Sequence, residues 1–283
     1  MGYPLVEHPV GSQVFVNGGY YAISSPEVTV LQEPYDKLAY YETIRLMDKT
    51  PLFLEEHLER LSKSVSSDPS NPISLDGIVE DIRDFLTKVP QEDHRSLRIV
   101  VSPDYRVIHY VDITLPSEED FKNGITTASL LWERQDPNVK AFRGDYKAAV
   151  AAVFDQTDAF EVILADNSGR LYEGSKSNFF AIVDGAVYSA SDDKILIGIT
   201  RRRVMEALVR EGIELKIGTF TLNELKEAGA ALFVSSTPFD ILPIATVDGV
   251  EFDSADNAVL KRIMSAYAGQ AAEYITDNKF WEA

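Results

Sequence analysis

The chain has 283 residues, of which 45% are hydrophobic, enough for one large or two medium α/β domains. Its 27 lysines and arginines against 45 acidic residues give a formal net charge of −18, so its average surface repels nucleic acids and anionic membranes. The absence of cysteine excludes disulfides, thiolate nucleophiles and cysteine zinc sites, and is consistent with a cytoplasmic location. No apolar run reaches the length of a membrane span, so we expect neither a membrane nor a nucleic-acid partner.

The first half of the chain predicts a small lobe of strands and helices. Turn residues Asn17-Gly18-Gly19 predict a hairpin, and Pro103-Asp104 predicts a turn between two strands. Ser74 is expected to be the N-cap of a helix. In chain order, we expect a hairpin at 13–23, a strand at 38–47, a helix within 50–65, a helix at 74–89, strands within 97–115 and a strand at 125–132.

A polar segment, ERQDPN, follows these elements and suggests a domain boundary. We therefore expect an N-terminal domain of residues 1–132, a linker at 133–139 and a C-terminal domain of residues 140–283. In the second domain we expect a helix at 146–154, a strand at 160–166, a hairpin at 179–190 across Asp184-Gly185, a helix at 198–212 that ends at Gly212, further strands up to 247 and a last helix at 257–277. The predicted fold is a two-lobed α+β or α/β protein.

Signatures of several large enzyme classes are absent. The sequence lacks GxGxxG, GxxxxGK[ST], HExxH and GxSxG, which mark dinucleotide-binding, nucleotide-triphosphate-binding, zincin and α/β-hydrolase proteins. Its histidines lie far apart in the sequence, so we expect no metal site. They are His8, His57, His94 and His109.

Residues spread over the chain have the chemistry needed to hold an aldehyde cofactor. The segment VKAFRGDYK (139–147) contains two lysines, and a lysine amine condenses with an aldehyde to a Schiff base. The glutamate of YEGSKSN (172–178) could keep a pyridine nitrogen protonated. A phosphate dianion could be held by the helix start GIT (198–200), the hydroxyls of VSST (234–237) and the arginine of HLERL (57–61).

The order of these segments resembles a known family. The chain resembles the class IV, fold-type IV pyridoxal-phosphate enzymes in the order of its motifs. These motifs are YETIR (41–45), HLERL, a lysine after the linker, EGSxSN, GITR (198–201) and SST (235–237). This family includes branched-chain aminotransferases, D-amino acid aminotransferases and aminodeoxychorismate lyases. The resemblance covers residues 38 to 250 and implies the cofactor pyridoxal 5'-phosphate, a two-lobed fold with a small N-terminal lobe, and a homodimer.

The resemblance also implies roles for individual residues. In this family the catalytic lysine precedes the position of Glu161 by 21 residues, which selects Lys140, whereas Lys147 would be an exposed lysine on the next helix. Glu173 would face the pyridine nitrogen and Arg60 the phosphate; the alternative for Arg60 is an exposed helix face. The expected cofactor-binding residues are Glu173, Arg60, Ile199, Thr200, Ser236, Thr237 and, as support of the loop, Asn178.

The implied reaction is transamination through a Lys140 aldimine, between a small branched-chain L- or D-amino acid and a 2-oxo acid. Candidate substrate-binding residues are Tyr41, Arg45, Arg98, Arg106 and His109. D-amino acid aminotransferases pair a tyrosine with Arg-x-His, but here Arg106 and His109 are one residue further apart, and strand alternation would direct them to opposite faces. Branched-chain enzymes usually have FEGIR where this chain has YETIR. The alternatives are an aminodeoxychorismate lyase and a non-catalytic relative.

Overall fold

The computed structural model describes residues 3–47, 49–70, 72–91, 96–141 and 143–278, so His94 lies outside the described residues. The chain divides into two compact units. Unit 1 comprises Met1–Thr114, Val139–Asp145 and Ala272–Ala283, and unit 2 comprises Leu115–Asn138 and Tyr146–Ala271. Across the described segments, no helix combines the length and hydropathy that a membrane span needs. The predicted mixed fold, with a small and a large α+β lobe, is confirmed.

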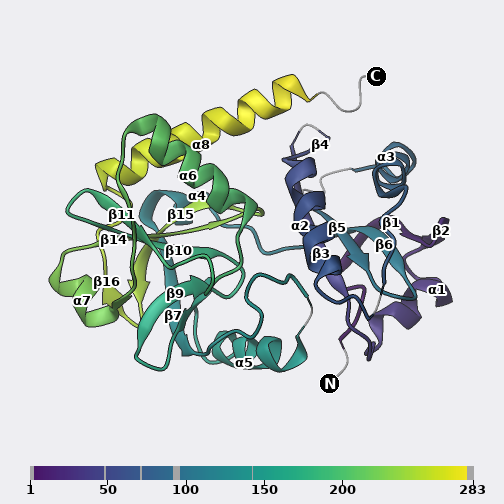
Figure 1. The fold of residues 1–283 in the computed structure, drawn as a ribbon, viewed down its shortest axis with the longest axis horizontal. Helices are drawn as coiled ribbons and strands as arrows, with labels where there is room; N and C mark the ends of the chain where they lie inside the picture. Colours follow the sequence, from purple (N-terminus) through teal and green to yellow (C-terminus); the bar gives the residue numbers. More distant parts are fainter. Residues whose placement is uncertain (1–2, 48, 71, 92–95, 142, 279–283) are drawn as a thin grey trace. The chain divides into compact units, whose positions relative to one another are not determined.

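Unit 1 is built on a six-stranded sheet in the order β2-β1-β6-β5-β3-β4, in which all neighbouring strands are antiparallel. Helices α2 and α3 cover one face of this sheet, and the N-terminal segment with α1 packs on the other (Figure 1). The elements are β1 (Pro9–Val16), β2 (Gly19–Ala22), α1 (Pro26–Thr29), a 3-10 helix (Val30–Gln32), β3 (Tyr40–Met47), β4 (Thr50–Pro51), α2 (Leu54–Ser66), α3 (Ile78–Lys88), β5 (Ser96–Val101) and β6 (Arg106–Val111).

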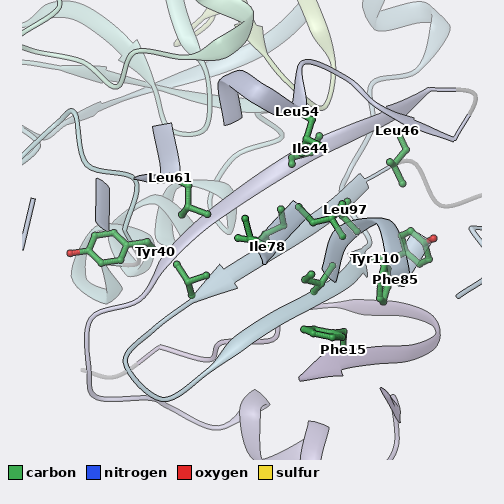
Figure 2. Close-up of a cluster of buried hydrophobic side chains, with 14 of the residues drawn as sticks. Phe15, Tyr40, Ile44, Leu46, Leu54, Leu61, Ile78, Phe85, Leu97 and Tyr110 are labelled. Carbon is green, nitrogen blue, oxygen red and sulfur yellow. The ribbon is translucent and has the colours of Figure 1, made fainter. Parts of the chain in front are cut away.

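Strand alternation in β3 separates two kinds of surroundings. Tyr40 and Ile44 lie in the apolar core beneath α2 and α3, which Figure 2 shows together with Leu61 and Phe85. Tyr41 and Thr43, which alternate with them along β3, point to the other face, where Tyr41 packs against the N-terminal segment. A side chain on the Tyr40 face is therefore buried between sheet and helices.

Helix α2 begins at Leu54, within the predicted range, whereas α3 begins later than predicted. Helix α3 starts at Ile78 after Gly77, whose φ of 72° places it in the left-handed region, and Ser74 is not its cap. The Ser74 hydroxyl accepts a hydrogen bond from the Asp76 amide at 3.1 Å instead. Helix α2 has no side-chain cap of its own, but the Tyr274 hydroxyl accepts a bond from the Leu54 amide at 3.1 Å. The start of α3 thus depends on local turn geometry, whereas the start of α2 is fixed by a residue 220 positions away in the sequence.

Unit 2 contains a larger mixed sheet of ten strands in the order β12-β11-β10-β14-β15-β7-β8-β9-β13, with β16 paired to β15. The pairs β7–β8, β7–β15 and β11–β12 are parallel. The elements that lie wholly or mainly in this unit are α4 (Glu118–Asn123), β7 (Ile125–Leu131), α5 (Gly144–Phe154), β8 (Glu161–Ala165), β9 (Arg170–Gly174), β10 (Asn178–Val183), β11 (Ala186–Ser189), α6 (Ile199–Glu211), β12 (Leu215–Ile217), β13 (Phe220–Thr221), α7 (Leu222–Glu227), β14 (Ala231–Ser236), β15 (Asp240–Val247), β16 (Val250–Glu251) and α8 (Ala258–Asp277).

The division between the units differs from the predicted boundary at 133–139. Strand β7 was expected in the N-terminal domain, but it is hydrogen-bonded between β8 and β15 in the large sheet, so unit 2 begins at Leu115. The segment Val139–Asp145 belongs to unit 1, because its backbone pairs with β3: the Tyr41 amide donates to the Lys140 carbonyl at 3.3 Å. Strand pairing, rather than the polar break, decides where the units divide.

Candidate active site

A buried carboxylate organises the charged residues of unit 1. Glu42 lies on the Tyr40 face of β3, beneath α2, and is 0% exposed. Arg60 on α2 binds both of its oxygens, with Nε 2.8 Å from Oε1 and Nη2 2.6 Å from Oε2. His57, one turn earlier on the same helix, places Nδ1 2.7 Å from Oε2. Arg60 is therefore a buried partner of Glu42, which excludes the alternative of an exposed helix face.

These contacts determine the charges of the cluster. Burial alone would raise the pKa of Glu42, but the charges of Arg60 and Lys140 and the hydrogen bonds from Arg60 and His57 outweigh it and hold the pKa well below its usual range. Burial lowers the pKa of His57 to about 4, although the bond to Glu42 opposes this shift. At neutral pH the cluster contains an ionised Glu42 and a neutral His57, whose Nδ1–H donates to the carboxylate.

Lys140 lies beside this cluster. Its Nζ is 3.7 Å from Glu42 Oε2 and 5.2 Å from the centre of the Tyr41 ring. Its backbone amide donates to the Ser64 hydroxyl on α2 at 3.3 Å, and its side chain is 16% exposed. Lys147 lies on α5 with intermediate rather than full exposure. Lys140, Arg60 and Tyr41, predicted from separate segments, are thus brought together within unit 1.

Two of the predicted substrate-binding residues lie on the other face of the same sheet. Arg98 on β5 and His109 on β6 are direct cross-strand neighbours. The Arg98 guanidinium lies 5.2 Å from the centre of the Tyr41 ring and donates through Nη1 to Glu7 at 3.0 Å. Burial, followed by the charge of Arg98, lowers the pKa of His109 to about 4, so this histidine is neutral at neutral pH.

The other two candidates lie elsewhere in unit 1. Arg106 faces α3, where it donates to Asp81 at 2.6 Å and to backbone carbonyls of the preceding loop. It is on the opposite face from His109, as alternation predicts, so an Arg106–His109 pair is not formed. Arg45 is near the far end of β3, where it pairs in register with Ser96. Arg98 is therefore the arginine of this set that lies beside Tyr41.

In unit 2, Glu173 is a buried carboxyl held by two donors. The Leu196 amide donates to Oε1 at 2.8 Å, and Arg134 Nη1 donates to Oε2 at 3.0 Å. Burial raises the pKa of Glu173 to about 7, and the charge of Arg134 and the Leu196 amide offset part of this effect. A cationic N–H group placed beside this carboxyl would favour its ionised form.

The turn after Glu173 is fixed by a second buried carboxylate. Glu161 on β8 accepts from the Ser175 hydroxyl at 2.6 Å and from the Ser177 hydroxyl at 2.7 Å. Gly174 has a packing reason, since a Cβ there would lie 2.0 Å from Ser177 Oγ. The small size of Gly174 therefore serves the turn. Glu161 thus positions the strand end that carries Glu173.

The segment before α6 joins several predicted residues. The Leu196 carbonyl accepts from Asn178 Nδ2 at 2.8 Å, while the Leu196 amide binds Glu173. Gly198 is the N-cap of α6, and a Cβ there would meet Asn178 Oδ1 at 2.2 Å. Asn178 therefore supports the start of α6, and Ile199 and Thr200 are in the first turn of this helix.

The start of α6 suits an anion. None of its first-turn residues is acidic and no side chain caps it, so the positive end of its dipole is not neutralised from within the helix. Strand β14 brings a second group of hydroxyls to this region, because Ser235 pairs in register with Asn178. Ser236 Oγ donates to the Lys176 carbonyl at 2.7 Å, and Thr237 follows directly. These residues fit a phosphate group.

Sequence reasoning missed three residues with clear structural roles. Glu42 was part of a motif but had no assigned partner, because its partners are distant in sequence. Arg134 was placed in a linker, and Glu161 served only to fix a spacing. A glutamate within an apolar strand, as in FEVILAD, is a signal that could have marked Glu161 as a buried, hydrogen-bonded carboxylate.

Residues 39–247 match the sequence profile of the family described as amino-transferase class IV. The chain is similar to a D-alanine aminotransferase of Listeria monocytogenes, with 30% identity over 235 residues that cover 75% of this chain and 78% of the relative. Its fold is similar to that of the Escherichia coli branched-chain amino acid aminotransferase, with 24% identity, a TM-score of 0.76 and coverage of 93% and 95%. A branched-chain aminotransferase from a T.th. strain, solved with pyridoxamine 5'-phosphate, has 21% identity, a TM-score of 0.72 and coverage of 95% and 98%. Because the profile covers well over half of its length, the chain belongs to the class IV aminotransferase family.

Proposed function

We propose that this protein is a pyridoxal-phosphate-dependent aminotransferase that transfers an amino group between a small amino acid and a 2-oxo acid. The observation that carries the proposal is Glu173, a buried carboxyl with a pKa of about 7, placed next to Leu196 and the uncapped start of α6. A family member needs an acid to hold a pyridine nitrogen and an anion site for a phosphate, and this region offers both.

When bound, pyridoxal phosphate supplies an aldehyde that condenses with amines and a ring that takes up an electron pair. The chain's own residues have separate tasks. Lys140 would hold the cofactor through its amine and would move the proton at the substrate α-carbon. Glu173 would keep the pyridine nitrogen protonated, and the amides of Ile199 and Thr200 with the Thr237 hydroxyl would hold the phosphate. Arg60 contributes positive charge.

Among the substrate-binding candidates, Arg98 and Tyr41 have the contacts that favour a role in holding a substrate carboxylate, because both lie in the group that includes Lys140. Arg106 does not share these contacts and is omitted from the proposed site. The relatives named above act on D-alanine or on branched-chain amino acids according to their names, so these two classes are the substrates to test first.

The test is a single-turnover assay of the cofactor-loaded protein with D-alanine, L-leucine and their mirror-image forms, each without a 2-oxo acid. The proposal expects at least one of them to convert the cofactor to its amine form in a one-to-one ratio with 2-oxo acid released. Lys140→Ala serves as the matched control and abolishes conversion. Release of pyruvate from aminodeoxychorismate, with no conversion by any amino acid, would establish the lyase alternative, and no reaction with any compound would support a non-catalytic relative.

A further inference from the structure

Two cations of unit 1 share one anion. Arg60 binds Glu42 through Nε and Nη2, and Lys140 Nζ lies 3.7 Å from the same Oε2 that accepts the Arg60 Nη2 bond. Glu42 is 0% exposed, and unpaired charges in such surroundings are strongly disfavoured. We propose that Glu42 is a positioning residue that fixes the Arg60 guanidinium and shields Lys140 from its positive charge. This inference rests on the proposed function only in the roles that it gives to Lys140 and Arg60.

The geometry of the Arg60 contact fixes an orientation as well as a distance. Two N–H groups of a planar guanidinium reach two oxygens of one carboxylate, which leaves little freedom of rotation. His57 adds a third bond to Oε2 and, being neutral, adds no charge. Glu42 is therefore held in place by α2 on one side and by its own strand on the other.

Glu42 and Arg60 act on Lys140 with opposite charges. The negative charge of Glu42 favours the ammonium form of Lys140, and the positive charge of Arg60 favours the neutral amine. Removing Glu42 would leave two cations side by side, so a larger fraction of Lys140 would be the unprotonated, reactive amine. Removing Arg60 would take away a cation that opposes the stabilisation of the ammonium form by Glu42. The two substitutions are thus expected to change the reactivity of Lys140 in opposite directions.

The experiment measures this reactivity in the cofactor-free protein. A limiting amount of an amine-reactive reagent is added at pH 8, and the labelling of Lys140 relative to Lys147 is read by mass spectrometry. Glu42→Gln is expected to raise this ratio about threefold to tenfold, and Arg60→Gln to lower it. Glu59→Gln is the matched control, since Glu59 neighbours Arg60 on α2 but is 53% exposed and pairs with Lys63, and it leaves the ratio unchanged.

A second measurement tests the orientation of Arg60. Glu42→Gln should weaken the binding of pyridoxal phosphate about tenfold, and Glu42→Asp, which keeps the charge but shortens the side chain, should weaken it as well.

A general loosening of the fold would increase labelling of Lys140 in both Glu42→Gln and Arg60→Gln. This result would overturn the inference, as would unchanged labelling in both variants. Should Glu42→Gln not fold, Arg60→Gln still decides the sign, because a lower labelling ratio supports the inference and an unchanged or higher ratio overturns it. The labelling needs no cofactor, so it stands even if the wild-type protein fails to bind pyridoxal phosphate, which would refute the proposed function alone.

Discussion

Replacing Glu173 by glutamine should remove a specific pH dependence from the stability of the cofactor-free protein. The Glu173 pKa rises from 4.5 to about 7 in the fold, chiefly through burial. The folded state thus keeps its proton over a pH range in which the unfolded chain has lost it. The stabilising contribution is complete below pH 4.5 and is lost as the pH rises through about 7. The difference between the two pKa values corresponds to about 3 kcal/mol of unfolding free energy.

Urea unfolding at a series of pH values between 4.5 and 8 measures this effect. The chain has two tryptophans, and a Trp281→Phe background leaves the fluorescence of Trp132 as the probe. Trp132 is a suitable reporter, because its ring packs on Tyr146 in unit 2 and its carbonyl accepts from the Tyr172 hydroxyl next to Glu173. The unfolding free energy of the parent minus that of Glu173→Gln should fall by about 3 kcal/mol across this range.

The same substitution at the exposed Glu251 controls for the loss of one charge from an acidic protein. In that variant the pH dependence should match the parent. Identical pH dependence in the parent and in Glu173→Gln would refute the reasoning, because it would mean that the Glu173 carboxyl titrates equally in the folded and unfolded chains.

Two further substitutions test which residues contribute to the site. Gly198→Ala would place a Cβ 2.2 Å from Asn178 Oδ1, so we expect a loss of about 1–2 kcal/mol in stability and weaker binding of pyridoxal phosphate, read by urea unfolding and by titration; unchanged binding would contradict a role for the start of α6. Arg106→Gln removes the ion pair with Asp81, which should lower the stability of unit 1 by about 1 kcal/mol and leave cofactor binding and transamination as in the parent. A large loss of activity in Arg106→Gln would return this residue to the site.

Local sequence patterns predicted most of the secondary structure. The alternation of apolar and polar residues and the backbone preferences of turn residues involve only a few neighbouring positions. The hairpin at Asp184-Gly185 formed between β10 and β11 as expected, and the pair of strands around Pro103-Asp104 became β5 and β6. The turn residue Asn17, with φ of 48°, likewise joins β1 to β2. These signals depend on backbone preferences that neighbouring residues already determine.

Long-range contacts were harder to predict, since they join segments with no shared local pattern. The parallel pairing of β7 with β15 joins residues more than a hundred positions apart, and it moved the domain boundary to Leu115. Arg60 follows Glu56 and Glu59 on its helix, which left an exposed face as the alternative to the expected phosphate contact, and its partner Glu42 lies 18 positions earlier on a different element. The residue types of the candidate site were therefore recognisable, but the pairs that position them became apparent only in three dimensions.

The proposed role of Lys140 is tested most directly by finding which side chain holds the cofactor. The protein is incubated with pyridoxal phosphate, reduced with borohydride, digested and mapped by mass spectrometry. We predict one label per chain, on the peptide that contains Lys140. A label on Lys147 or on any other lysine, or no label at all, would contradict it.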